Sequence, residues 1–210
     1  MMDFTQIPLT SGFCQNMVVV YISRGHNTPD GIEQKYEHII SQSSNNSEFV
    51  KNAWDQIFSK LIDNCKEKGI TEVEIFSDGG PKHYKCAETV LYFHEASEFP
   101  HKEGIQLTYH YFPSYHGHHI YDGVGNQLKR KLLEIECHTQ VNTVQAVAAT
   151  GNKLKNHLVT PLIFRQQEQT GIKFPSIRKA HKISFNKNII QFYRHSTDTK
   201  PYVEFEIMEE

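Results

Sequence analysis

Three aspartates in this 210-residue chain lie where a predicted strand or helix begins or ends. Asp78 directly follows the alternating run "EVEIF" and Ser77, Asp122 lies in "HGHHIYDGVGNQLKRK", and Asp3 lies in the opening "MMDFTQIPL". Carboxylates are the hard oxygen ligands that suit Mg²⁺ or Mn²⁺. Three carboxylates at one point would hold two such ions for in-line attack on a phosphodiester. We therefore predict Asp3, Asp78 and Asp122 as metal ligands and catalytic residues.

Turn chemistry offers a second interpretation of the same residues. Asp-Gly is among the commonest turn dipeptides, so Asp78-Gly79 and Asp122-Gly123 are each also explained as a turn or a helix cap. Only two residues precede Asp3, which is fewer than a strand needs in order to pair well. The sequence leaves both interpretations open for each aspartate.

The elements that would position these residues follow from hydrophobic periodicity and from turn and cap signals. A long helix begins near the Ser and Asn residues of "SQSSNNS" and ends at Gly69, with apolar residues at helical spacing between them. Before it we predict strands over 1–9, 17–23 and 36–42, with a glycine- and proline-containing hairpin turn between the last two. After it we predict a strand over 71–77, a helix over 82–99, a strand over 105–114, and a loop that enters a basic helix within 116–136.

Three strands followed by alternating helices and strands predict an α/β domain with a mixed sheet and helices packed on it. This order is typical of the ribonuclease H-like fold, in which acidic residues that lie far apart in sequence converge. We expect a ribonuclease H-like core over residues 1–150 and a basic C-terminal extension, 151–210, packed on that core.

Two blocks of the chain resemble a known family. "FSDGGPKHYK" and "YHYFPSYHGHHIYDGVGNQLKRKL" together resemble the central blocks of DDE-type transposases and their domesticated relatives, over roughly residues 70–135. The resemblance implies a ribonuclease H-like fold and a divalent-metal site for DNA strand cleavage and transfer, with Asp78 and Asp122 as ligands. It also implies that basic side chains contact the phosphate backbone, namely Lys82, Lys85, Lys129 and Arg130.

Two departures from this pattern bear on activity. The chain begins at or inside the first catalytic strand, without the upstream DNA-binding domain that an autonomous transposase needs. The third acid is Asp rather than Glu. A truncated or domesticated core is therefore an equal expectation, and the alternative function is a catalytically inactive module that binds nucleic acid or protein.

Charge is distributed unevenly along the chain. The formal net charge is −2, yet residues 151–200 hold ten Lys or Arg against two acids, and aromatic residues are interleaved with them. A phosphate-binding surface needs this combination, which makes DNA the predicted partner and Lys179 and Lys182 predicted contacts. A solvated charged face is the alternative explanation.

Histidine is abundant, with thirteen residues in the chain. We expect His116 or His118 to line the carboxylate site and to position substrate or shuttle a proton. A structural zinc site formed with His118, His119, His83 or His110 is the alternative, although the short, repeated ligand spacing of zinc sites is absent.

Composition and cysteine spacing indicate the cellular compartment of the protein. No stretch reaches the roughly 18 consecutive apolar residues of a membrane span, and we see no secretory signal peptide. Cys14, Cys65, Cys86 and Cys137 are widely scattered, which fits reduced thiols in the nucleus or cytoplasm. A homodimer is the assembly we consider beside a monomer.

Overall fold

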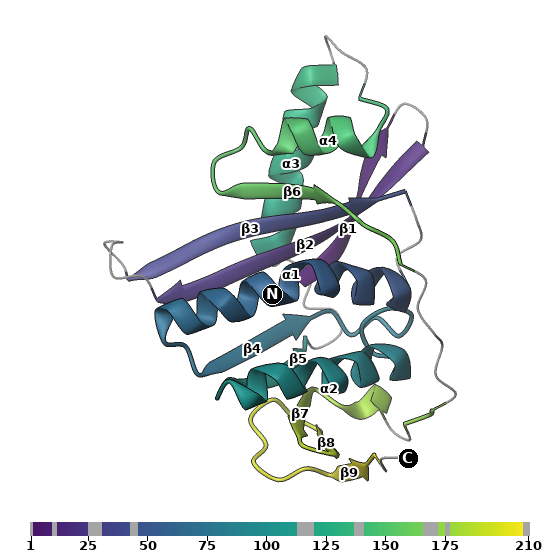
Figure 1. Ribbon diagram of the computed structural model, residues 1–210. Helices are drawn as coiled ribbons and strands as arrows, with labels where there is room; N and C mark the ends of the chain where they lie inside the picture. Colours follow the sequence, from purple (N-terminus) through teal and green to yellow (C-terminus); the bar gives the residue numbers. More distant parts are fainter. Residues whose placement is uncertain are drawn as a thin grey trace. The chain divides into compact units, whose positions relative to one another are not determined.

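The computed structural model describes residues 2–9, 12–24, 31–42, 46–112, 120–136, 141–165, 172–174 and 177–207. These residues form two compact units, each of which mixes helices and strands (Figure 1). Unit 1 comprises Met1–Asn45 and Gly117–Ile163, and unit 2 comprises Asn46–His116 and Phe164–Glu210. The predicted mixed α/β class is confirmed.

The sheet of unit 1 has the strand order β6-β3-β2-β1. Its strands are β1 (Met2–Leu9), β2 (Gly12–Arg24), β3 (Ile32–Ser41) and β6 (His157–Pro161). β1 with β2 and β2 with β3 are antiparallel pairs, whereas β6 is parallel to β3. Pairing of Arg24 with Ile32 confirms the hairpin that the turn residues predict.

Two helices complete unit 1, α3 (Ile120–Glu136) and α4 (Val144–Gly151). Thr143 begins α4, because its side chain accepts a hydrogen bond of 3.1 Å from the amide of Ala146. The helices share one apolar cluster with the sheet, formed by Ile7, Leu9, Cys14, Ile40, Leu128, Leu132, Val141, Val147, Ala148 and Val159.

Gly151 allows α4, α3 and β6 to pack closely. A methyl group at this position would come within 2.3 Å of Val159 Cγ2 and 2.8 Å of Leu128 Cδ1. We expect Gly151→Ala to lower the free energy of unfolding by about 1–3 kcal/mol, the usual cost of overpacking. Gly123→Ala is the control, because the same methyl meets open space on α3. Urea unfolding that finds the two variants equally stable would contradict this packing.

Unit 2 contains α1 (Ser47–Lys68) and α2 (Ala87–Lys102) and a sheet with the strand order β4-β5-β7-β8-β9. β4 and β5 are parallel, and each later pair is antiparallel. The strands and a short 3₁₀ helix have these bounds: β4 (Glu72–Ser77), β5 (Gln106–Tyr111), β7 (Lys182–Asn186), β8 (Ile189–Tyr193), β9 (Val203–Glu206) and η1 (Ile177–Lys179).

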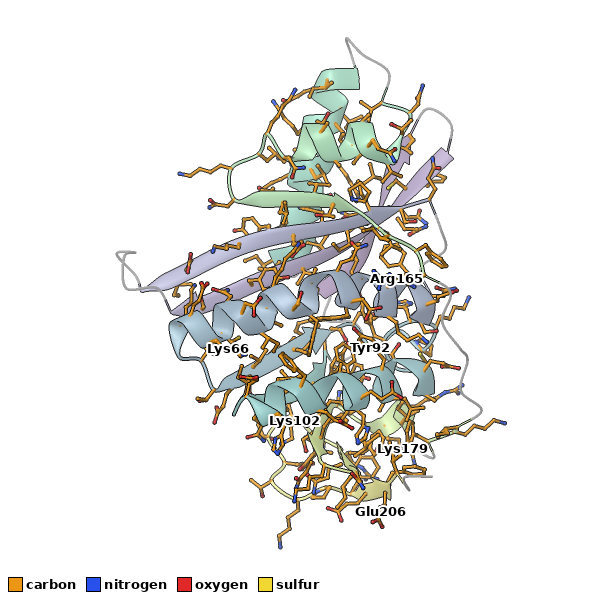
Figure 2. The ribbon with its side chains drawn as sticks, viewed as in Figure 1. Lys66, Tyr92, Lys102, Arg165, Lys179 and Glu206 are labelled. Atoms are coloured by element: carbon orange, nitrogen blue, oxygen red, sulfur yellow. The ribbon has the colours of Figure 1, made fainter. Side chains whose placement is uncertain are left out.

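Cap residues define α1 as the sequence predicts. The side chain of Asn46 accepts a hydrogen bond of 3.0 Å from the amide of Phe49, and Gly69 adopts the left-handed φ of 64° that ends the helix. The ring of Trp54 on α1 lies 5.2 Å from that of Phe93 on α2, which in turn lies 4.6 Å from Tyr109 on β5. Figure 2 shows side chains filling the space between the helices and strands of the unit, with Tyr92 labelled near α2.

The described residues after 150 belong to the sheets of the two units rather than to a separate extension. β6 joins the sheet of unit 1, whereas β7, β8 and β9 join the sheet of unit 2. The boundary expected at residue 150 therefore differs from the division that the structure makes. Over the described ranges, no helix combines the length and apolar character that crossing a membrane requires.

Candidate functional site

Asp78 lies directly after β4, at the carboxyl end of two parallel strands. Ligands of open sheets gather at such strand ends. The side chain of Asp78 is half-buried, so its carboxylate is neither sealed in the core nor fully solvated. The predicted placement of Asp78 at the end of a strand is confirmed.

His83 lies beside the Asp78 carboxylate. A methyl group at Gly80 would come within 2.4 Å of His83 Nε2 and 3.2 Å of Asp78 Oδ2, so both side chains approach the same glycine. Burial lowers the pKa of His83, and the negative charge of Asp78 only partly opposes this effect. At neutral pH the imidazole is therefore uncharged and able to accept a proton.

Lys85 supplies a positive charge that acts on Asp78 in this turn. Only 9% of Lys85 is exposed, and its Nζ lies 4.8 Å from the ring centroid of Tyr111. Burial lowers the pKa of Lys85, while the charge of Asp78 opposes that shift. The sequence predicts a phosphate contact for Lys85, whereas the structure places it inside the turn as a partner of Asp78 and Tyr111.

Buried hydroxyl groups hold the main chain at this turn. Tyr109 donates a hydrogen bond of 2.9 Å to Ser77 Oγ, which donates one of 3.1 Å to the carbonyl of Asp78. The carbonyl of Gly80 accepts from the amides of Tyr84 and Lys85 at 3.0 and 2.9 Å. The position of Asp78 is therefore fixed from beneath by side chains that do not themselves reach solvent.

The basic C-terminal segment reaches the same edge through β7. The amide of Tyr111 donates to the carbonyl of His181 at 2.9 Å, and burial, then the charge of Lys85, lower the pKa of His181. The next residue, Lys182, is half-buried, with its Nζ 4.1 Å from the ring centroid of Tyr193 and a hydrogen bond to the carbonyl of Asp198. Lys182 thus adds a second lysine, beside Lys85, at this edge of the sheet of unit 2.

Asp3 and Asp122 both belong to unit 1. Asp3 is paired with Val18 near the start of β1, and Asp122 is the third residue of α3, where its side chain is half-buried. One turn along α3, a methyl group at Gly125 would come within 3.0 Å of Thr5 Cγ2. Positions 122 and 125 share a helix face, so α3 packs on β1 close to Asp122.

A chain of polar side chains, buried at Asn16 and His38, crosses the sheet of unit 1 from Thr5. Asn16 donates to Thr5 Oγ1 at 3.1 Å and pairs through its Oδ1 with His38 Nδ1 at 3.2 Å. His38 Nε2 lies 2.9 Å from Nδ1 of His157, whose Nε2 lies 3.1 Å from Gln127 Oε1 on α3. Burial, then the charge of His157, lower the pKa of His38 to about 3, so this network is built from neutral imidazoles.

The remaining predicted residues are distributed as follows. The side chains of Lys82, Arg130 and Lys179 are exposed, and that of Lys129 is half-buried. His110 is buried and stacks on Phe76 with ring centroids 4.5 Å apart. The proposed catalytic His116 and the alternative zinc ligands His118 and His119 lie outside the described residues. Within the part of the chain that the structure describes, no three His, Cys, Asp or Glu gather as metal ligands.

Sequence reasoning misses His83 as the neighbour of Asp78 and misses the link between His38 and His157. The first has a local signal, since both residues lie in one short turn. The second has none, because its partners are 119 residues apart and come together only when β6 pairs with β3.

Comparison with known proteins gives a family assignment. No curated protein and no solved structure matches the chain. A family model described as a domain of unknown function (DUF8701) matches residues 17–196, a range that includes Asp78 and Asp122 and begins after Asp3. Because this match covers most of the chain, the protein belongs to that family.

Proposed function

We propose that the protein is a ribonuclease H-like domain related to DDE transposases, which cleaves or transfers DNA phosphodiesters with Mg²⁺ or Mn²⁺. One observation carries the proposal. The three aspartates fall on the first strand, directly after the fourth strand and in the first turn of α3, in an element order of three strands followed by alternating helices and strands. These are the positions at which that fold holds its acidic residues.

The donor set fits the ions. Asp3, Asp78 and Asp122 supply oxygen ligands, which Mg²⁺ and Mn²⁺ prefer. The half-buried settings of Asp78 and Asp122 leave part of each side chain accessible. The bound ions would supply activation of water or a 3′-hydroxyl and stabilisation of the leaving oxygen.

The side chains around Asp78 have separate roles in this proposal. Neutral His83 accepts a proton at the edge of the site, since its imidazole lies beside the carboxylate. Lys85 positions the carboxylate through its charge, and exposed Lys82, Arg130 and Lys179 hold the phosphate backbone. DNA affinity should therefore fall steeply with salt, because each neutralised phosphate releases counterions.

A non-catalytic nucleic-acid-binding module is the second candidate. The observation that favours it is the exposure of Lys82, Arg130 and Lys179, which would bind phosphates without any metal. Such a module would keep the basic surface and its salt dependence, but it would leave the DNA strands intact.

A cleavage assay separates the two functions. Purified protein is incubated with supercoiled plasmid in Mn²⁺, in Mg²⁺ and in EDTA, and DNA binding is measured in parallel in EDTA. We expect nicked or linear product with either ion and none in EDTA. Binding without metal-dependent product would contradict the catalytic proposal and support the binding module, whereas absence of binding would overturn both.

A further inference from the structure

A buried asparagine on α1 holds the main chain of Arg165. Asn52 is only 1% exposed, and the amide of Arg165 donates to its Oδ1 at 2.7 Å while its Nδ2 donates to the carbonyl of Arg165 at 3.1 Å. The same Nδ2 also donates to the carbonyl of Glu48 at 2.8 Å. The side-chain amide of Asn52 thus pairs with the main chain of Arg165 as a neighbouring strand would. We call these two hydrogen bonds the Asn52 clamp.

The side chains at this fixed point are exposed rather than packed. Phe164 is 49% exposed and Arg165 is an exposed residue, yet the clamp uses only main-chain atoms of Arg165. Within the described part of the chain, the Arg165 guanidinium has no carboxylate partner. Folding therefore fixes the main chain of Arg165, whereas the exposed ring of Phe164 and the charge of Arg165 contribute little to the stability of the free protein.

The clamp lies at the same end of unit 2 as Asp78. Asn52 to Lys68 spans about 24 Å of helix, and the chain then returns through β4, about 20 Å long, to Asp78. In Figure 2, Arg165 and Lys66 are labelled at opposite ends of α1, with Arg165 on the side where the β4 arrow of Figure 1 ends. Residues 151–200, which include Arg165, carry ten Lys or Arg against two acids.

We propose that Phe164 and Arg165 form a single-stranded nucleic-acid contact, in which Arg165 binds a phosphate and Phe164 stacks on an adjacent base, presented by the Asn52 clamp. Exposed aromatic rings beside cations are the features with which proteins hold single strands. This inference rests on the proposed function, because it places the contact where a strand passing Asp78 would lie. An unpaired segment, rather than intact duplex, is the ligand that both side chains fit.

Fluorescence anisotropy on the full chain tests the contact. A labelled single-stranded oligonucleotide and its duplex are titrated in EDTA over a series of salt concentrations. We expect Arg165→Ala to reduce the salt slope by about one phosphate contact. Phe164→Ala should weaken single-strand binding about 5-fold to 100-fold, leave the salt slope unchanged and affect duplex binding less. Asn52→Ala should weaken single-strand binding, although both contacting side chains are retained.

The opposite end of unit 2 provides matched controls. Phe99 is 51% exposed and Lys102 is exposed at the end of α2, so Phe99→Ala and Lys102→Ala likewise remove an exposed aromatic ring and a positive charge, far from the clamp. If the wild type binds and the 164 and 165 variants match these controls, the inference is overturned and the proposed function stands. If the wild type binds neither nucleic acid, the proposed function itself fails.

Discussion

Asp78→Asn is expected to reduce Mn²⁺-dependent DNA cleavage by about a hundredfold or more. Even the outer-shell partners of metal ligands change affinity or activity by 10-fold to 100-fold when replaced, and Asp78 is a proposed direct ligand. Asparagine keeps the size of the side chain and is equally suited to turns, so the turn after β4 should persist. The measurement is the initial rate of plasmid nicking by folded variant and wild type.

This substitution separates the two interpretations of "FSDGG". If Asp78 were only a turn residue, the asparagine variant would cleave at the wild-type rate. Asp63→Asn is the control, because Asp63 is exposed on α1 and lies in no proposed site. Equal rates for the Asp78 and Asp63 variants would contradict the assignment of Asp78 as a ligand.

Acidification is expected to destabilise unit 1 through His38. Its pKa is about 3 in the folded protein and about 6.5 when unfolded, so between these values the unfolded chain binds the additional proton. The contribution of His38 to the free energy of unfolding is therefore fully present above pH 6.5. It is lost as the pH falls below this value, by up to about 1.4 kcal/mol per pH unit. His157, whose pKa burial also lowers, acts in the same direction.

Replacement of the buried imidazole should remove this pH dependence. Denaturant unfolding followed by circular dichroism at pH 7, 6 and 5 is expected to show a shallower loss of stability for His38→Gln than for the wild type. His101→Gln, which changes an exposed histidine of α2, should retain the wild-type pH dependence. Parallel losses in the wild type and the His38 variant would contradict the network.

Local signals predict the first two-thirds of the fold well. The first strand, the β2–β3 hairpin, the capped helix α1 and the strand before Asp78 all follow from periodicity, turn residues and caps. The strands after residue 150 are only four or five residues long, so their alternation is too short to identify. β6 in addition pairs with β3, more than a hundred residues earlier in the chain, and no local pattern indicates such a partner.

The sequence likewise predicts the positions of some residues of the candidate site and not those of others. The place of Asp78 at a strand end follows from the apolar run before it, and Asp122 in the first turn of α3 follows from the helix pattern. The burial of Lys85 could not be predicted, because lysine is almost always found at the protein surface. Pairing of Asn52 with Arg165 joins residues 113 apart, which only the folded chain brings together.

The central claim is that Asp3, Asp78 and Asp122 together hold divalent ions, and calorimetric titration of the protein with Mn²⁺ tests it most directly. We expect two Mn²⁺ ions per wild-type chain and the loss of at least one in each single Asp→Asn variant. No Mn²⁺ binding by the folded wild type, or the same stoichiometry and affinity in all three variants, would contradict the claim.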